Sequence, residues 1–163
     1  MSHDSASQLF ADDLTVGQTF VGEPHEIGDA AFKAFADLTG DHHPIHYDNA
    51  YAAKTRFGKR LAHGLLVMSM SAFGSTDSSR RFADCMVAFL GQDCRFLKPV
   101  FVGDVLTCRY TISSIERKAG ADAAVVQFDI DLVNGAGEAV LSGHHRYLLL
   151  CRPGGAQGNS HVS

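Results

Sequence analysis

The chain has 163 residues, 45% of them apolar, and a formal net charge of −4. That is enough material for one domain with a hydrophobic core. Basic residues form no run and do not interleave with aromatic residues, which argues against a nucleic-acid partner. No segment approaches the roughly 18 consecutive apolar residues of a membrane span. The opening MSHDSASQ lacks the pattern of a secretory signal. We therefore expect a cytoplasmic protein with no membrane association.

The expected domain runs from residue 9 to residue 151. Residues 1–8 and the Gly- and Ser-rich segment 152–163 contain little to bury, so both are predicted to be disordered. The four cysteines show neither a CxxC pair nor metal-ligand spacing. They are interpreted as buried thiols in a reducing compartment: Cys85, Cys94, Cys108 and Cys151.

Helical signals fill the first half of the chain. In GDAAFKAFADLTGD, Asp29 is a candidate N-cap and Gly40 a candidate glycine after the last turn, so a short helix is predicted. It leads into GDHHPIHYDNA, where Pro44 interrupts any helix and pushes His43 toward extended geometry. A brief helix in DNAYAAKT is expected to follow. The segment AHGLLVMSMSAFGS is apolar almost all round, which predicts a buried central helix whose first residues are His63 and Gly64.

From Met86 onward the periodicity is that of strands. Four segments bounded by turn signals follow one another: MVAFLGQDCRFLKPV, DVLTCRYTISSIER, DAAVVQFDIDLVN and EAVLSGHHRYLLL. In VVQFDIDLV, apolar and polar residues alternate strictly, as in a strand with one buried face. These elements predict an α+β fold in which a curved antiparallel sheet wraps around one long central helix.

The histidine-rich segment from Gly40 to Ala50 allows three readings: a metal site, a solvated loop, or part of an acid–base pair. Pro44 separates His42 from His46, so the two histidines cannot share a helix face as zinc ligands do in HExxH. No further ligand with recognisable spacing follows, and no metal is expected. A solvated loop is ordinary turn composition. However, a polar His–Asp loop near the positive end of a buried helix favours a site that binds something anionic.

Three separated motifs carry a resemblance: GDHHPIHYDNAYA, AHGLLVMSM and RFLKPVFVGDVLT. In this order they resemble the MaoC-like, (R)-specific enoyl-CoA hydratase family, and the resemblance covers roughly Phe10 to Leu150. It implies a hot-dog fold, usually dimeric, in which a long helix is wrapped by an antiparallel sheet. The fold read from periodicity agrees with that implication.

The resemblance also implies roles for individual residues. Asp41 and His46 match the aspartate and histidine that hold and activate water, Gly64 the glycine whose N–H binds the thioester oxygen, and Ser69 a serine near the pair. His43 replaces the family's asparagine and, with His63, is placed among the expected substrate-binding residues. For His63, a role as a third catalytic group and ordering of the first helical turn are the alternatives.

The predicted reaction is reversible hydration of trans-2-enoyl-CoA to (R)-3-hydroxyacyl-CoA by an Asp–His pair. Three alternatives stay open: an acyl-CoA thioesterase on the same fold, a dehydratase for a branched or dicarboxylic hydroxyacyl-CoA, and a non-catalytic acyl-CoA-binding protein. The expected partners are an acyl-CoA thioester and a second copy of the chain or a larger homo-oligomer.

No dinucleotide or Walker glycine pattern occurs, so no cofactor is expected. His144 and His145 face opposite sides of the last strand, and both are interpreted as structural.

Overall fold

The computed structural model describes residues 7–117 and 120–153. Within them, no helix is both long and apolar enough to cross a bilayer. The helices are α1 (Asp29–Thr39), α2 (Pro44–Tyr47), α3 (Asn49–Ala53) and α4 (Gly64–Ser69), with 3₁₀ turns η1 (Ala11–Asp13), η2 (Phe73–Ser75) and η3 (Asp77–Phe82). The strands are β1 (Thr19–Val21), β2 (His25–Glu26), β3 (Met86–Phe96), β4 (Val105–Arg117), β5 (Ala123–Asn134) and β6 (Ala139–Leu150).

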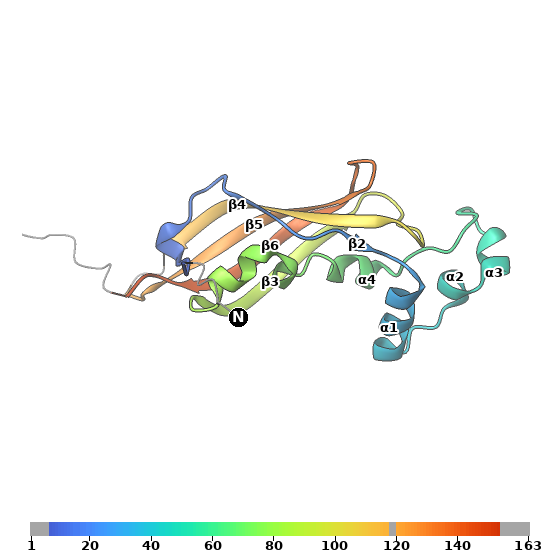
Figure 1. Cartoon of the computed structure of the whole chain (residues 1–163), viewed down its shortest axis with the longest axis horizontal. Coiled ribbons are helices and arrows are strands. Elements are labelled where there is room, and N and C mark those ends of the chain that lie inside the picture. The colour runs from blue at the N-terminus through green and yellow to red at the C-terminus, as the bar shows by residue number, and fades with distance from the viewer. Residues whose placement is uncertain (1–6, 118–119, 154–163) are drawn as a thin grey trace, which may run out of the picture.

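The strands form one antiparallel sheet in the order β1-β4-β5-β6-β3, and β2 also pairs with β4 (Figure 1). The four predicted long strands are confirmed. Burial of every second side chain sets the period of β4 and β5, whereas β3 has no buried side chain. In β5, Val126, Phe128, Ile130 and Leu132 are buried, as their alternation indicated. The sequence patterns did not predict the short strands β1 and β2.

The central helix α4 is shorter than expected. It ends at Ser69, and the chain continues through a turn into η2 and η3. Serine hydroxyls explain the break: those of Ser69 and Ser71 each donate to the carbonyl three residues earlier. Such bonds compete with the helical backbone ladder. Leu66 and Val67 pack α4 into the core of the sheet, whereas Leu65 is 62% exposed, so α4 is not buried on every side.

Helices α1, α2 and α3 lie beyond the end of the sheet, on the far side of α4 (Figure 1). α1 begins at Asp29 with Gly28 as its N-cap, so Asp29 is the first helical residue and not the cap. Gly40 ends α1 with φ of 77°, the left-handed conformation that glycine adopts most easily, as predicted. This arrangement puts the histidine-rich segment next to the first turn of α4.

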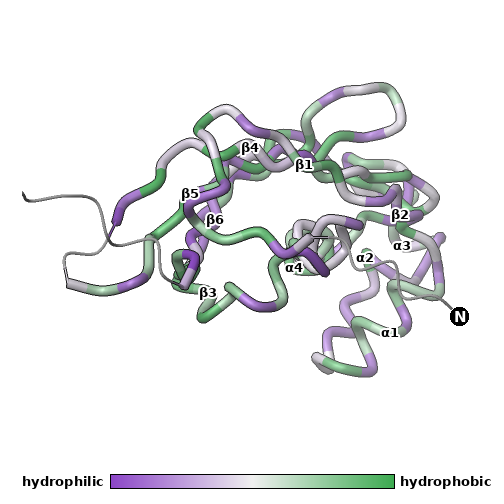
Figure 2. The backbone as a smooth tube through the Cα atoms, turned by 60° about the vertical axis from the view of Figure 1, so that its left-hand side comes forward, coloured by the Kyte–Doolittle hydropathy of each residue, from purple (hydrophilic) through white to green (hydrophobic). Residues whose placement is uncertain are grey.

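Strand β3 is one edge of the sheet and exposes apolar side chains. Figure 2, which colours the chain by residue hydropathy, shows hydrophobic residues beside the β3 label. The exposed large apolar residues of β3 and the turn after it are Met86, Val87, Phe89, Leu90, Phe96 and Leu97. β3 also approaches β6 closely at Gly143, where a Cβ atom would lie 2.1 Å from the Asp93 carbonyl oxygen.

The ends predicted to be disordered, 1–8 and 152–163, lie largely outside the described residues. Where they are described, both ends bond to the body of the fold. Gln8 donates to the carbonyl of Arg80 at 3.0 Å, and the backbone N–H of Arg152 donates to Asp12 at 2.6 Å.

Candidate active site

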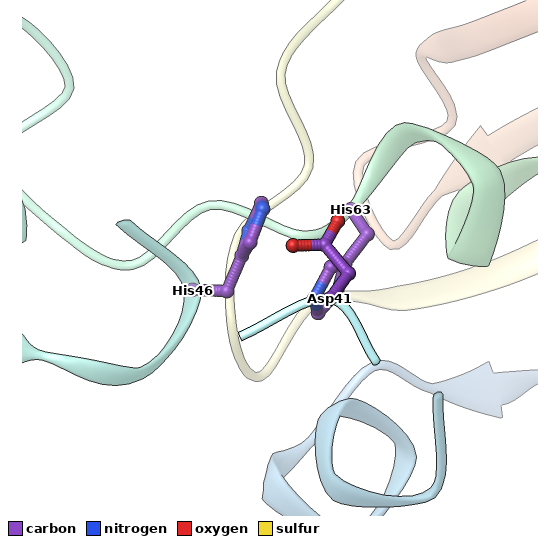
Figure 3. A group of neighbouring side chains, drawn as sticks. All are labelled: Asp41, His46 and His63. Atoms are coloured by element: carbon purple, nitrogen blue, oxygen red, sulfur yellow. The ribbon is translucent and has the colours of Figure 1, made fainter. Parts of the chain in front are cut away.

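Three side chains meet beside the first turn of α4. One carboxylate oxygen of Asp41 and one ring nitrogen each of His46 and His63 all lie within 4.8 Å of one another. Asp41 comes from the loop after α1, His46 from α2, and His63 from the residue just before α4. Figure 3 shows the Asp41 carboxylate beside both imidazole rings. The sequence predicted Asp41 and His46 as a pair, and the structure adds His63 to it.

The loop that carries Asp41 is held by its own short-range bonds. The backbone N–H of His43 donates to Asp41 Oδ1 at 3.2 Å, an Asx turn. His43 is in turn the N-cap of α2, where its Nδ1 accepts from the N–H of Ile45 at 3.3 Å. Pro44 is the first residue of α2, a position that needs no N–H donor, so it starts a helix here and does not end one. His43 therefore caps α2, a task that asparagine also performs well.

His46 has a defined tautomer. Its Nδ1 lies 2.6 Å from the carbonyl oxygen of Leu61, which can only accept, so Nδ1 carries the proton. Leu61 is itself fixed, because its N–H donates to Ile45 and it forms an isolated bridge with Phe101 of the β3–β4 connection. In the neutral ring, Nε2 is then left with a lone pair. Such a nitrogen is a proton acceptor, as general-base catalysis requires.

His63 is buried, with 2% of its surface exposed, and stacks on His46 with ring centroids 3.7 Å apart. Burial lowers the pKa of His63, and the neighbouring His46 lowers it further. The imidazole of His63 is therefore neutral at neutral pH. Its Nε2 lies 2.9 Å from the hydroxyl of Tyr47. Its Nδ1 is a buried atom without a hydrogen-bond partner among the described residues.

Tyr47 connects these parts and was not anticipated from the sequence. Its hydroxyl lies 3.0 Å from the carbonyl of Phe32, 3.2 Å from that of Asp41 and 2.9 Å from His63 Nε2. Carbonyls only accept, so the phenol donates to them and accepts from the His63 N–H. This leaves the unpartnered Nδ1 of His63 as a lone pair. The only sequence signal was a tyrosine directly after the histidine of the motif.

We expect Tyr47→Phe to lower the free energy of unfolding by about 1–2 kcal/mol, because it leaves the buried His63 N–H without an acceptor. Thermal or urea unfolding measures this directly. Tyr51→Phe is the matched control, since Tyr51 is exposed and its hydroxyl has no bond to a described residue. Equal effects of the two substitutions would contradict the role given to Tyr47.

Gly64 and Ser69 occupy opposite ends of α4. Gly64 is its first residue, and no described residue accepts a hydrogen bond from the Gly64 backbone N–H. The ring of Phe96 lies where a Cβ atom at Gly64 would be in tight contact, at 3.3 Å. The hydroxyl of Ser69 donates to the carbonyl of Leu66 at 2.6 Å, and Ser69 lines a different cavity from the one beside Gly64. The structure therefore does not place Ser69 in the Asp41–His46–His63 group.

The same three side chains include the ligand types that zinc prefers. Their geometry fits a zinc ion poorly. The rings of His46 and His63 are inclined by only 25° and stacked, so their in-plane lone pairs run side by side. A single ion requires lone pairs that converge on one point. One nitrogen of each ring is also engaged, by Leu61 and by Tyr47.

A curved antiparallel sheet packed on a central helix, with an Asp–His pair at the helix start, defines the class of hot-dog hydratases and dehydratases. The family model described as "MaoC like domain" matches residues 12–131. The chain belongs to this MaoC-like family. The hot-dog fold is confirmed by a Mycobacterium tuberculosis protein described as a double hot-dog, with TM-score 0.77 over 93% of this chain and 47% of that one, at 22% identity.

Among curated relatives, the (R)-specific enoyl-CoA hydratase of Aeromonas caviae is 34% identical over 66% of this chain and 77% of its own length. The 3-hydroxybutyryl-CoA dehydratase of Methylorubrum extorquens is 32% identical over 66% of both chains. Among solved structures, the MaoC-like dehydratase from Rhodospirillum rubrum has a TM-score of 0.77 and 28% identity, covering 89% of this chain and 99% of that one. These similarities agree with the family that the three sequence motifs indicated.

Proposed function

We propose that this protein reversibly hydrates trans-2-enoyl-CoA to (R)-3-hydroxyacyl-CoA. The observation that carries the proposal is the meeting of the Asp41 carboxylate with His46, whose Nδ1 is engaged by Leu61 and whose Nε2 is a free acceptor. Relatives named as enoyl-CoA hydratase and 3-hydroxybutyryl-CoA dehydratase support the same reaction class.

The proposed chemistry starts from one water held by two acceptors. The carboxylate of Asp41 and Nε2 of His46 each accept a hydrogen bond from it. One of the two takes a proton as the water oxygen bonds to C3 of the enoyl thioester. The electron pair of the double bond moves toward the thioester oxygen, and C2 then receives a proton from the pair. Asp41 and His46 return to their starting protonation states. The same two residues therefore serve hydration and dehydration.

The negative charge that develops on the thioester oxygen needs a hydrogen-bond donor. The backbone N–H of Gly64 supports this role, because it is free among the described residues and Gly64 is exposed. One such donor contributes about 2.7–4 kcal/mol to transition-state stabilisation in enzymes where it has been removed. A cavity of about 320 Å³ between Gly64, Val67 and Phe96 lies directly beside it, and Arg56 and Lys98 also line that cavity.

A homodimer is part of the proposal. Edge strands with exposed apolar side chains are templates for pairing with another chain, and β3 presents Phe89 and Phe96 at 52% and 53% exposure. Leu65 of α4 is exposed too. A second copy of the chain is the expected partner of this surface. The four cysteines are all free, and three are buried as predicted, whereas Cys94 is only partly buried because it lies on the edge strand β3. Free thiols support the proposed cytoplasmic location, where thiols stay reduced.

The direct test is incubation of the purified protein with crotonyl-CoA while the absorbance of the conjugated enoyl thioester is followed. We expect loss of absorbance, formation of (R)-3-hydroxybutyryl-CoA and no release of free CoA. Addition of EDTA should leave the rate unchanged, since the stacked imidazoles fit a zinc ion poorly. Free CoA detected with a thiol reagent would instead establish a thioesterase. Tight acyl-CoA binding without any product would establish a binding protein.

A further inference from the structure

A second cavity of about 380 Å³ lies farther along α4, between that helix, β3 and β6. Met68 and Ser71 form its helical side, Phe89 and Gln92 its β3 side, and His145 with Tyr147 its floor on β6. Its surface is mainly apolar, yet its floor is made of two side chains with polar atoms. An apolar cavity with a few convergent polar groups is the usual form of a small-molecule site.

The polar groups of the floor form a chain whose donors can be assigned. The hydroxyl of Ser71 lies 2.7 Å from the carbonyl of Met68, so it donates there and its oxygen accepts from His145 Nε2 at 3.2 Å. His145 is 2% exposed, and burial lowers its pKa to about 4, so its ring is neutral. A neutral ring with a proton on Nε2 has an acceptor at Nδ1.

Tyr147 is the end of this chain and retains hydrogen-bonding capacity. Its hydroxyl lies 3.4 Å from His145 Nδ1, longer than an ordinary bond, and has no other partner among the described residues. The phenol can therefore still donate its proton and accept on its oxygen. Buried polar atoms in native proteins are normally paired, and Tyr147 is largely buried at 8% exposure. Because Tyr147 lines the cavity, a polar group of a bound ligand would give its hydroxyl a second partner.

The cavity lies at the end of α4 opposite Gly64. Gly64 and Met68 are four residues apart in α4 and therefore share one face of that helix, and Ser71 follows in the turn after it. Across from them on β3, Phe96 lies against Gly64 and the side-chain amide of Gln92 contacts the sulfur of Met68 at 2.8 Å. At helical rise the six residues of α4 span roughly 8 Å. A medium-length acyl chain held at Gly64 by its thioester is long enough to cover that span and enter the cavity that begins at Met68.

The charge of the cavity restricts what the end of that chain can be. None of the described residues that line it is lysine, arginine, aspartate or glutamate. A carboxylate buried there would have no countercharge, which is strongly unfavourable. A purely hydrocarbon end would leave the Tyr147 hydroxyl poorly bonded. An uncharged oxygen substituent, a hydroxyl or an oxo group, satisfies the hydroxyl without burying a charge.

We propose that Tyr147 and His145 select acyl thioesters that carry a hydroxyl or oxo group toward the far end of the acyl chain. This inference rests on the proposed hydratase function and narrows its substrate class. An added hydroxyl on the substrate bonds to Tyr147 as donor and acceptor, and an oxo group accepts from Tyr147 alone. Among the alternatives raised by the sequence, a dicarboxylic acyl chain is disfavoured by this cavity.

The test compares trans-2-octenoyl-CoA with its 7-hydroxy, 8-hydroxy and 7-oxo derivatives. We expect at least one derivative to exceed the parent about five- to tenfold in kcat/KM, the effect of one hydrogen bond between uncharged groups. Tyr147→Phe should abolish this preference, so that the three derivatives and the parent compound are hydrated with similar kcat/KM by that variant. Tyr51→Phe is the control, because it removes an exposed hydroxyl from a different part of the fold.

Two results would overturn the inference: equal kcat/KM for all four compounds in the wild type, or a preference that survives Tyr147→Phe. If no compound is hydrated, binding measurements still test the inference. Dissociation constants of octanoyl-CoA and 7-hydroxy-, 8-hydroxy- and 7-oxo-octanoyl-CoA are then compared by calorimetry. Tighter binding of an oxygenated chain, lost in Tyr147→Phe, would support the cavity while the proposed reaction fails. Equal binding would reject the cavity too.

Discussion

Asp41→Asn is expected to reduce kcat for trans-2-enoyl-CoA hydration by about 10²–10⁴-fold, the usual contribution of a positioned acid or base. The substitution keeps the shape of the side chain. Its amide oxygen can still accept from the N–H of His43, so the Asx turn is retained. What is lost is the negative charge and the ability to take a proton. Because Asp41 is exposed, its replacement should leave the unfolding free energy within about 0.5 kcal/mol of the wild type.

The matched control for this variant is Asp37→Asn. Asp37 is also an exposed carboxylate, at the end of α1, and it pairs only with Lys33 one helical turn earlier, at 2.5 Å. Its removal should leave kcat unchanged. Stopped-time assays with crotonyl-CoA and product analysis on a chiral column measure both variants. Wild-type turnover by a folded Asp41→Asn protein would exclude the proposed mechanism.

Gly143→Ala has the largest expected effect on stability. A Cβ at this position would lie 2.1 Å from the Asp93 carbonyl oxygen and 2.7 Å from the Cα of Cys94. Both are backbone atoms of β3, so no side-chain rotation can relieve the overlap, and the two strands must separate. We expect a loss of about 3 kcal/mol or more, at or above the upper range for overpacking. Urea unfolding of the purified variant measures this loss.

Gly135→Ala provides the comparison. Gly135 lies between β5 and β6, has no positive φ, and has no atom within 4 Å of the position of an added Cβ. Its substitution should be neutral or stabilise slightly, by reducing the freedom of the unfolded chain. If both variants unfold at the same urea concentration, the close approach of β3 and β6 at Gly143 is wrong.

Strands β4 and β5 were predictable because burial of alternate side chains imposes their pattern. Tyr110, Phe128 and Leu132 face the core since each lies on the inward side of a strand covered by α4 and the 3₁₀ turns. Strands β1 and β2 have three and two residues, too few to display a period. The length of α4 depends on whether serine hydroxyls bond back to the helix. Composition does not settle that choice.

The site was partly predictable for a similar reason. Asp41 and His46 stand in one motif, and their spacing is a property of the sequence. The hydrogen bonds of Tyr47 to Phe32 and His63 cross from α2 to other elements and leave no local pattern. The pairing of Ser71 with His145, 74 residues apart, depends likewise on the fold. His145 was interpreted as structural because nothing in its strand indicates the cavity above it.

Every group proposed for the chemistry lies between Asp41 and Gly64, in a segment of short helices and loops. The residues proposed to contact the acyl chain lie elsewhere, from Met68 onward and in β3 and β6. Mutation can therefore alter which chains are accepted without touching the residues that move protons. Proteins with this arrangement can acquire new substrates through single substitutions in the cavity while the proton-transferring residues, and so the reaction, stay the same.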